Sequence, residues 1–492
     1  MKAIMVVGTT SHAGKSFLTA ALCRLLSRQN RQVTPFKGQN MALNAYVTTD
    51  GGEIGHAQAV QAWAAGIEPT TDLNPILLKP QGDMTSQVIL NGKVAGKTSA
   101  ADYYRDYFSP GWQAIAASLE RLAATYEIVV CEGAGSPAEI NLKHRDLTNM
   151  RVAKHLNAAT ILIADIDRGG VFAHIVGTLQ LLEPEERALI KGIVINKFRG
   201  QLSLLDSGIQ WLEDYTGIPV LGVIPWRESM LPAEDSLDLL DRRSRKPNAD
   251  LQISVLRLPR IANFTDFDPL DAEPTVSLQY VSLNQDLGYP DAVIIPGSKT
   301  TIADLLALQQ SGMAEQLKSY AAAGGTILGI CGGWQMLGRQ VLDPDCFEGE
   351  ITSCPGLNLL PLETTLAAEK ITRQRQVKSC YPQAGLSVVG YEIHQGVTKW
   401  LHGMTGKPIF DDGELGSVSE CQHIWGCYLH GLFDNGSWRR SWLNLLRQQR
   451  GLSLLPIEVG NYQQQREVML DAVADLVAEH LNLKLIWDLI PI

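Results

Sequence analysis

Residues Val6–Ser16 read VVGTTSHAGKS: the end of an apolar run, a loop of small residues, then Gly-Lys-Ser. The run Ala3–Val7 is typical of a buried strand, and the apolar residues after Ser16 share one helical face. This order predicts a loop at a helix N-terminus, where backbone N–H groups and the helix dipole bind phosphate. Lys15 would add a positive charge, and the Ser16 hydroxyl would be a ligand for Mg²⁺.

The loop is one residue longer than the common P-loop, because five residues separate Gly8 from Gly14. In this spacing it resembles the P-loop of dethiobiotin-synthetase-like proteins. A helix start with a purely structural role is the alternative interpretation. We expect ATP to bind at Gly8, Thr9, Thr10, Gly14, Lys15 and Ser16.

A second strand-like run ends in a carboxylate followed by glycines, in the sequence VVCEGAG at Val129–Gly135. A carboxylate at the end of a strand next to the loop could bind a metal ion on the triphosphate. We therefore expect Glu132 to be a second Mg²⁺ ligand beside Ser16. A carboxylate that only caps the next turn is an equal alternative, and the same holds for Asp165 and Asp167.

Five short β-branched runs alternate with helical stretches and predict a wound parallel α/β sheet. They are Ala3–Val7, Glu127–Val130, Thr160–Ala164, Gly192–Asn196 and Val220–Ile224. A polar, charged stretch containing Pro247 then favours a linker. Beyond it the strand pattern restarts at Leu251–Leu258, Ala292–Ile295, Thr326–Ile330 and His423–Leu429. The predicted organisation is an N-terminal domain (1–240), a linker (241–250), a second α/β domain (251–445) and a helical extension (446–492).

The composition excludes several classes of protein. A net charge of −10 without long runs of like charge argues against a nucleic-acid or anionic-membrane surface. The eight cysteines show no paired metal-binding spacing, so reduced thiols are expected. No segment approaches the ~20 apolar residues of a spanning helix. We expect a cytoplasmic protein without a tightly bound prosthetic group, and the sequence leaves its oligomeric state open.

A cysteine lies between a strand-like run and a helix in Gly325–Gly338, GTILGICGGWQMLG. Small residues on both sides are typical of a nucleophile elbow, where the helix N-terminus favours a thiolate and offers N–H groups to an oxyanion. Cys331 is therefore the expected nucleophile for an amide carbonyl, with Gly332 in the oxyanion hole. A small buried cysteine with no reactivity is the alternative.

A thiol nucleophile needs a base, and the leaving ammonia needs an acid. His430, at the end of HIWGCYLHGLF, is expected to do both. The arrangement resembles class I glutamine amidotransferases, and this resemblance implies that Gly297 supplies a second oxyanion N–H. Many members of that class place a glutamate two residues after the histidine, whereas this sequence has Leu432. Either a dyad suffices or another residue orients His430.

Longer motifs resemble the cobyric acid synthase family over nearly the whole chain. They include PFKGQNMALNAYVT at Pro35–Thr48, LNPILLKP at Leu73–Pro80, ADIDRGGVFA at Ala164–Ala173, RLPRIANFTDFDPL at Arg257–Leu270 and GYEIHQG at Gly390–Gly396. The resemblance implies an enzyme of cobalamin biosynthesis. It would use ATP, Mg²⁺ and glutamine to amidate the b, d, e and g carboxylates of adenosylcobyrinic acid a,c-diamide, through acyl phosphates. The expected partners are thus small molecules, including a corrinoid.

Polar residues of the first of these motifs are candidate corrinoid or nucleotide contacts, and an internally hydrogen-bonded loop explains them equally well. They are Lys37, Gln39, Asn40 and Asn44. His394 is a further polar residue near the amidotransferase site, but a structural role is expected for it.

Two rival functions remain. Cobyrinic acid a,c-diamide synthase shares both domain types and amidates other carboxylates. A P-loop partitioning-type ATPase with an inactive amidotransferase-like domain is the rival from another class. Such ATPases typically have a signature lysine early in the P-loop, whereas no lysine lies between Gly8 and Lys15 here.

Overall fold

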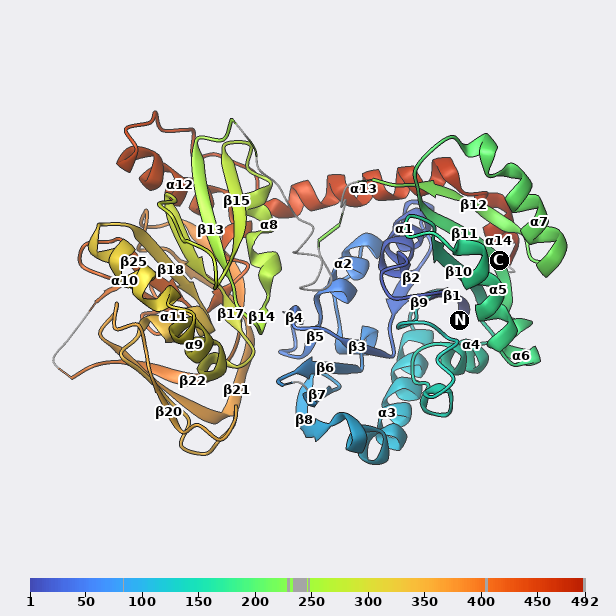
Figure 1. Ribbon diagram of the computed structural model, residues 1–492, viewed down its shortest axis with the longest axis horizontal. Coiled ribbons are helices and arrows are strands. Elements are labelled where there is room, and N and C mark those ends of the chain that lie inside the picture. Colours follow the sequence, from blue (N-terminus) through green and yellow to red (C-terminus); the bar gives the residue numbers. More distant parts are fainter. Residues whose placement is uncertain (83, 228–230, 233–245, 247, 403–405, 490–492) are drawn as a thin grey trace.

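The computed structural model describes residues 1–492 except 83, 228–230, 233–245, 247, 403–405 and 490–492. It forms two α/β domains side by side, joined along the top by a long C-terminal helix (Figure 1). Residues 241–245 and 247 of the predicted linker lie outside the described residues.

A six-stranded parallel sheet forms the core of the N-terminal domain, in the order β12-β11-β10-β1-β9-β2. Its strands are β1 (Lys2–Gly8), β2 (Val33–Phe36), β9 (Ile128–Glu132), β10 (Ala159–Asp165), β11 (Ile190–Phe198) and β12 (Val220–Pro225). Helices α1 (Lys15–Arg28), α2 (His56–Ala65), α4 (Met150–Leu156), α5 (Val171–Leu181), α6 (Pro184–Arg187) and α7 (Asp206–Thr216) surround it. The predicted wound sheet is confirmed, and β2 is the strand that the sequence pattern missed.

A smaller β unit follows β2 and lies between the parallel sheet and the C-terminal domain (Figure 1). It contains the sheet β3-β6-β7-β8 and the hairpin β4-β5. The bounds are β3 (Gln39–Met41), β4 (Ala45–Val47), β5 (Glu53–Gly55), β6 (Ile76–Pro80), β7 (Thr85–Leu90) and β8 (Lys93–Ser99), followed by α3 (Ala100–Ala123). No sequence pattern predicted this unit, because its strands are short and partly polar.

The C-terminal domain contains a seven-stranded sheet in the order β15-β13-β16-β18-β25-β24-β23. Neighbouring strands from β15 to β25 are parallel, and β24 and β23 are added antiparallel. The bounds are β13 (Leu251–Arg257), β15 (Val276–Ser282), β16 (Ala292–Ile295), β18 (Thr326–Ile330), β23 (Lys407–Pro408), β24 (Gly416–Val418) and β25 (Ile424–Cys427). Helices α9 (Thr301–Gln310), α10 (Met313–Ala322), α11 (Gly332–Leu337) and α12 (Gly436–Gln449) belong to this domain.

A second sheet, β20-β19-β21-β22-β26, carries a long hairpin of β21 (Leu362–Lys378) and β22 (Ser387–Trp400), with the short strands β19 (Gln340–Leu342) and β20 (Ser353–Pro355) beside it. It corrects one prediction, since His423–Leu429 is not one strand. The run divides into β25 and β26 (Leu429–His430), which belong to different sheets. Tyr428 lies between these two strands, and its N–H bonds to the carbonyl of Leu415. This division brings His430 beside Tyr391 of β22.

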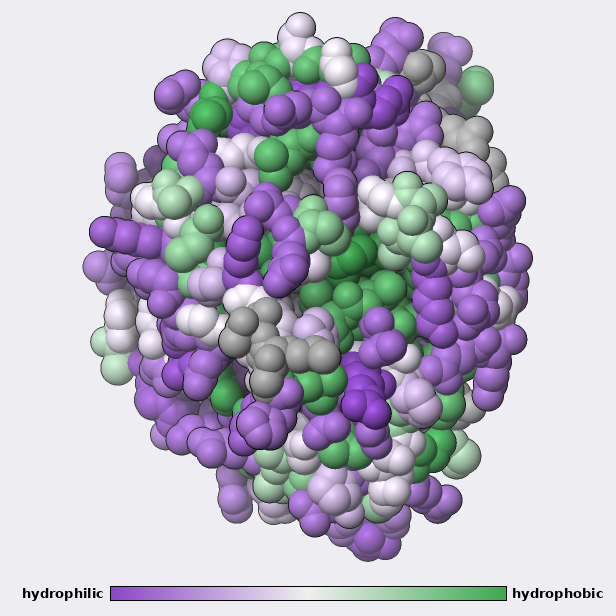
Figure 2. All heavy atoms as spheres, turned by 90° about the vertical axis from the view of Figure 1, so that its left-hand side faces the viewer, coloured by the Kyte–Doolittle hydropathy of each residue, from purple (hydrophilic) through white to green (hydrophobic). Residues whose placement is uncertain are grey.

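The C-terminal extension returns to the N-terminal domain. Helix α13 (Tyr462–His480) packs against α1, where Arg24 lies 2.7 Å from Asp471 and Arg28 lies 2.5 Å from Asp475. Helix α12 runs across the expected boundary at residue 445. None of the described helices is both long enough and apolar enough to cross a membrane. The end of the molecule formed by the C-terminal domain is mostly hydrophilic, with a smaller hydrophobic area near its centre (Figure 2).

Candidate active sites

The expected phosphate loop connects the end of β1 to the start of α1. Gly14 caps α1 with a φ of 105°, and a Cβ there would lie 2.1 Å from the amide nitrogen of Asn196. Only glycine fits, because that backbone conformation is strained for other residues and the space is filled. Asn196 in turn donates to the carbonyl of Ala13 at 2.9 Å, so β11 fixes the end of the loop.

The residues expected to bind phosphate and metal lie together. The Lys15 ammonium donates to the carbonyls of Thr10 and Gly135, each at 3.1 Å, and so closes over the loop. The Ser16 hydroxyl donates to Oε1 of Glu132 at 2.8 Å. The buried Thr9 hydroxyl finds no hydrogen-bond partner among the described residues. An unsatisfied hydroxyl beside a glycine-capped helix start fits a phosphate-binding loop.

Glu132 is almost fully buried and is surrounded by donors. Lys37 lies 2.8 Å from its Oε1, and Gln61 donates to its Oε2. An anionic carboxylate beside a serine hydroxyl suits Mg²⁺, which takes one or two protein oxygens together with phosphate and water. No cluster of three or more His, Cys, Asp or Glu suited to a metal occurs in the described part of the chain.

The other two carboxylates considered for the metal are held by cations. Asp165 pairs with Lys197 at 2.9 Å, and the same ammonium donates to the carbonyl of His12 in the loop. Asp167 pairs with Arg199 at 2.7 Å. The bond of Lys197 to His12 gives Asp165 a role in supporting the loop.

All four polar residues proposed as substrate contacts form internal hydrogen bonds, and Lys37 does so by donating to Glu132. Gln39 accepts from the hydroxyl of Tyr103 at 2.6 Å, and Asn40 donates to Gln58 at 2.9 Å. Asn44 accepts from the backbone N–H of Phe264 at 3.0 Å and so ties the two domains together. The alternative of an internally bonded loop is therefore supported for all four, and the partner of Lys37 is the metal candidate Glu132.

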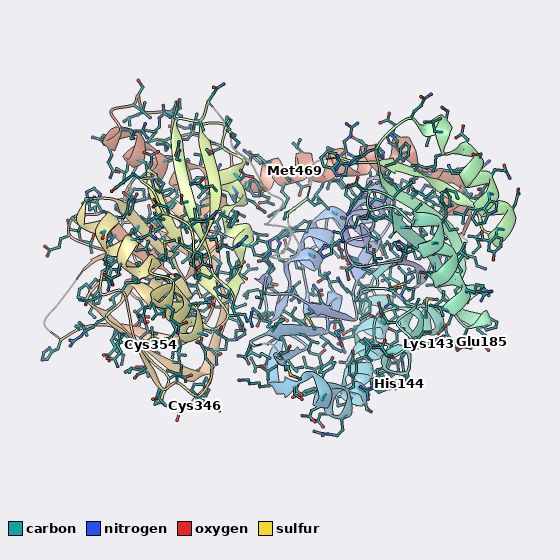
Figure 3. The ribbon with its side chains drawn as sticks, viewed as in Figure 1. Lys143, His144, Glu185, Cys346, Cys354 and Met469 are labelled. Atoms are coloured by element: carbon teal, nitrogen blue, oxygen red, sulfur yellow. The ribbon has the colours of Figure 1, made fainter. Side chains whose placement is uncertain are left out.

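Cys331 occupies a one-residue turn between β18 and α11. Its φ is 52°, a left-handed conformation that is rare and strained for a residue with a side chain. Its thiol donates to the backbone carbonyl of Ile393 at 3.6 Å. All eight cysteines are free thiols, and Cys346 and Cys354 lie toward the lower edge of the domain (Figure 3). The strained turn distinguishes Cys331 from the other buried cysteines, as a nucleophile elbow requires.

The structure identifies the residue that orients His430. Its Nδ1 lies 2.6 Å from Oδ2 of Asp266, and the other oxygen of Asp266 accepts the N–H of Gly431 at 2.9 Å. Leu432, at the position where many class I glutamine amidotransferases have a glutamate, is buried in the core. Asp266 was missed because it precedes His430 by 164 residues, although its motif FTDFDPL already contained two carboxylates among apolar residues.

The charges around His430 favour its protonated form. Burial by itself lowers the pKa of an imidazole, but the Asp266 carboxylate and the sulfur of Cys331 raise the pKa of His430 to about 10. A hydrogen bond to Cys331 contributes to this rise, so the imidazole faces the sulfur with Nε2 while Nδ1 faces Asp266. The three residues form a linear Cys-His-Asp arrangement.

The two glycines expected in the oxyanion hole lie close to each other, because Gly332 packs against Ser298, the residue after Gly297. A Cβ on Gly297 would lie 3.4 Å from Cε1 of His430, and one on Gly332 would lie 3.0 Å from the backbone nitrogen of Ser298. Gly297 lines the pocket at Cys331, whereas Gly332 is not part of its lining.

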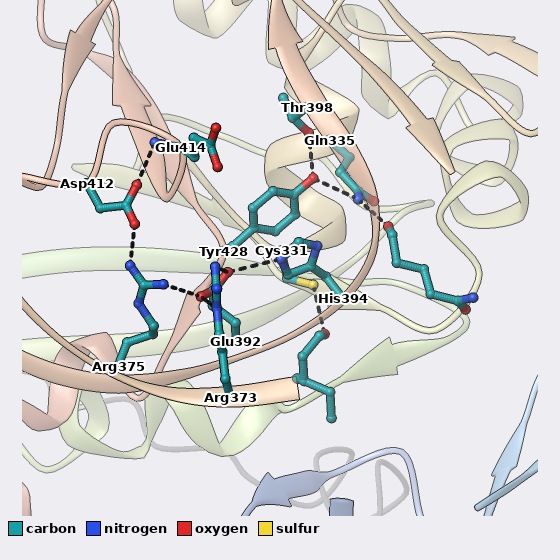
Figure 4. Close-up of polar contacts among 12 residues, drawn as sticks. Cys331, Gln335, Arg373, Arg375, Glu392, His394, Thr398, Asp412, Glu414 and Tyr428 are labelled. Carbon is teal, nitrogen blue, oxygen red and sulfur yellow. Dashed lines mark hydrogen bonds and ion pairs between the residues drawn. The ribbon is translucent and has the colours of Figure 1, made fainter. Parts of the chain in front are cut away.

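His394 stacks on Tyr428 with ring centroids 3.6 Å apart and lies 3.3 Å from Glu392. The Tyr428 hydroxyl bonds to Gln335 at 3.1 Å (Figure 4). Burial lowers the pKa of His394, which favours a neutral imidazole. These contacts suit a structural wall of the pocket.

The pocket at Cys331 is a cavity of about 50 Å³. Its lining includes Cys331, His430, Gly297 and Gln335 of the C-terminal domain, and also Lys79 of β6 in the N-terminal domain. A residue of the other domain thus closes the site.

Known proteins match both domains. The family model for a CobQ/CobB/MinD/ParA nucleotide binding domain matches residues 4–238, and that for a CobB/CobQ-like glutamine amidotransferase domain matches residues 252–438. A solved structure of PurLQS from Thermotoga maritima aligns with 40% of this chain and 99% of its own, at 17% identity and a TM-score of 0.32.

Curated relatives match almost the entire chain. A cobyric acid synthase of Rippkaea orientalis is 70% identical over 98% of this chain and 99% of its own. One of Synechocystis sp. is 68% identical over 100% of this chain and 99% of its own. The chain therefore belongs to the cobyric acid synthase family of glutamine-dependent amide ligases.

Proposed function

We propose that this chain amidates the b, d, e and g carboxylates of adenosylcobyrinic acid a,c-diamide, with glutamine as the nitrogen donor and ATP as the activator. The observation that carries the proposal is the arrangement of Cys331, His430 and Asp266 in the same chain as a phosphate loop. One site can release ammonia and the other can activate a carboxylate.

In the first half-reaction the sulfur of Cys331 attacks the amide carbon of glutamine, so that a C–S bond forms and the C–N bond breaks. His430, protonated at neutral pH, gives its proton to the departing ammonia. Water then attacks the thioester, and neutral His430 accepts its proton as glutamate leaves. Asp266 keeps the imidazole in the orientation that both steps need.

In the second half-reaction the substrate carboxylate receives a phosphoryl group from ATP, and ammonia displaces phosphate to form the amide. The loop Gly8–Ser16, including the Lys15 ammonium, would hold the phosphates. Ser16 and Glu132 would hold Mg²⁺. When bound, Mg²⁺ neutralises charge on the transferring phosphoryl. Ammonia would pass between the domains through a sheltered path that begins at the pocket shared with Lys79.

The test is mass spectrometry of the corrinoid diamide after incubation with the protein, ATP, Mg²⁺ and glutamine. We expect successive conversion of carboxylic acids into amides. An unchanged corrinoid would contradict the proposal, and amidation of cobyrinic acid at the a and c positions instead would favour the a,c-diamide synthase activity. The reaction is proposed to occur in the cytoplasm.

A further inference from the structure

A group of charged residues lines the pocket of Cys331. Lys79, Lys299, Lys370 and Glu348 all face this cavity. Lys79 and Lys370 share Glu53, with their nitrogens 2.7 Å and 2.5 Å from its two oxygens. Glu53 belongs to β5 and Lys370 to β21, so this ion triad joins the two domains and occupies two of the three lysines.

Lys299 is the lysine left over. Its ammonium makes neither a hydrogen bond nor an ion pair within the described ranges, although it lines the cavity. It follows Gly297 by two residues, just before α9 begins, and lines the same pocket as Gly297 and Cys331. Burial and the neighbouring ammonium groups of Lys370 and Lys79 lower the pKa of Lys299 to about 7. Such a cation gains from an anionic ligand.

Glu348 supplies the opposite charge. One of its oxygens accepts the backbone N–H of Ile302 at 3.0 Å, at the start of α9, which fixes the carboxylate in the pocket. Glu348 and Lys299 interact electrostatically but form no ion pair within 4 Å of each other. The pocket thus contains the Lys299 ammonium and the Glu348 carboxylate, held apart from each other, next to the Cys331 sulfur that would attack an amide.

The cavity is small and polar. Its 50 Å³ corresponds to a few water molecules, since one water needs roughly 10–15 Å³ on this measure. A large or apolar ligand does not suit such a site. Glutamine does, because it carries an amide at one end and a carboxylate and an ammonium on one carbon at the other.

We propose that Lys299 and Glu348 form the subsite for the α-amino acid end of glutamine, with Lys299 binding the α-carboxylate and Glu348 the α-ammonium. The amide end then points to Cys331, and Lys79 of the N-terminal domain and Lys370 of the C-terminal domain, held together by Glu53, line the subsite from both domains. This inference rests on the proposed glutaminase role of Cys331.

The test compares glutamine with two truncated amides in a glutaminase assay on the full chain. 4-Aminobutanamide lacks the α-carboxylate, and glutaramic acid lacks the α-amino group. For the unmodified protein we expect kcat/KM to fall roughly 10- to 100-fold with each of them, since each loses one charged hydrogen-bonded contact. Lys299→Met should reduce kcat/KM for glutamine to about the level of 4-aminobutanamide, yet still discriminate against glutaramic acid. Glu348→Gln should show the reverse pattern.

Two controls accompany the test. Amidation with ammonium chloride should be unchanged in both variants, which shows that they fold and that the synthetase site works. Lys318→Met, at an exposed lysine of α10 paired with Glu315, is the matched control and should behave as the unmodified protein. An equal loss for all three amides, or no loss, in Lys299→Met would overturn the inference. Failure of the unmodified protein to release ammonia from glutamine would instead contradict the proposed function.

Discussion

Two strand-turn-helix units form the two sites, and they use the same backbone device in opposite ways. In the N-terminal domain six residues, 9–14, connect β1 to α1, and the residue directly before the helix, Gly14, is left-handed, as is His12 within the loop. In the C-terminal domain the single residue Cys331 connects β18 to α11 and is itself left-handed. Both units end a parallel strand at a helix N-terminus, where N–H groups face a developing or full negative charge.

The difference lies in which atoms are made available. A left-handed glycine offers no side chain, so the longer loop presents backbone N–H groups and Lys15 to a ligand with several oxygens. A left-handed cysteine projects one side chain from a turn, and its neighbours hold the other catalytic groups. The phosphate groups of ATP would need the several N–H groups of a longer loop, whereas the one sulfur of Cys331 needs only a single-residue turn.

The largest expected effect comes from removing the nucleophile of the elbow. Cys331→Ser should lower glutamine-dependent amidation by roughly 10⁴-fold, because the hydroxyl is a far weaker nucleophile. Amidation with ammonium chloride should persist, since the phosphate loop is untouched. Parallel rate measurements with both nitrogen sources check this, with Cys380→Ser at an exposed thiol as the control. Equal loss with both sources would mean that the two units do not act separately.

Removing the cation of the phosphate loop should give the reciprocal result. Lys15→Met is expected to lower amidation by roughly 10²- to 10³-fold with either nitrogen source, because a charge that stabilises the phosphoryl transfer is lost. Glutamate release from glutamine should continue at Cys331. Lys93→Met, at an exposed lysine of β8, serves as the control. Amidation at an unchanged rate would argue against a role for the loop in ATP binding.

Asp266→Asn should lower glutamine-dependent turnover by roughly 10²-fold, because the orientation and charge of His430 depend on this carboxylate. The variant also changes stability with pH. The pKa of His430 is raised from 6.5 to about 10 in the folded chain, so its stabilisation is complete below pH 6.5 and is lost as the pH rises through 10.

The difference in the free energy of unfolding between the unmodified protein and Asp266→Asn should therefore shrink as the pH rises from 6.5 to 10. Urea unfolding at several pH values measures it, and Asp345→Asn, at an exposed position, is the control. A difference that grows with pH would contradict the assignment of Asp266.

The smallest expected effect concerns the backbone of the elbow. Cys331→Gly should be more stable than Cys331→Ala by about 1 kcal/mol, since glycine adopts the left-handed conformation without strain. In the phosphate loop, Gly14→Ala should destabilise the protein instead. Thermal unfolding of the three variants tests this. Equal stability of the two Cys331 variants would mean that the elbow stores no strain.

Local patterns explain what the sequence predicted. The strand, loop and helix around Lys15 and around Cys331 are contiguous, so their order and small residues indicated both units, and Ala292–Ile295 and Thr326–Ile330 match β16 and β18 residue for residue. Buried parallel strands are short apolar runs, which also identified the first sheet.

The remaining features depend on contacts between distant segments. Asp266 lies in a short 3₁₀ helix, Phe264–Phe267, that follows β14 (Ile261–Ala262), and no spacing in the sequence encodes its contact with His430. Lys79 enters the pocket from the other domain, and the helical extension was predicted without the partner, α1, that its helix α13 contacts. Division of His423–Leu429 between two sheets depends on pairing with β22, which a periodic pattern does not show.

The transfer of nitrogen from one unit to the other is the central claim, and isotope labelling tests it most directly. The corrinoid diamide is incubated with the protein, ATP, Mg²⁺, glutamine labelled with ¹⁵N in the side-chain amide, and an excess of unlabelled ammonium. If ammonia released at Cys331 passes within the protein to the carboxylate activated at the phosphate loop, each new amide carries ¹⁵N despite the unlabelled excess. Amides that contain mainly unlabelled nitrogen would show that the two sites are not connected.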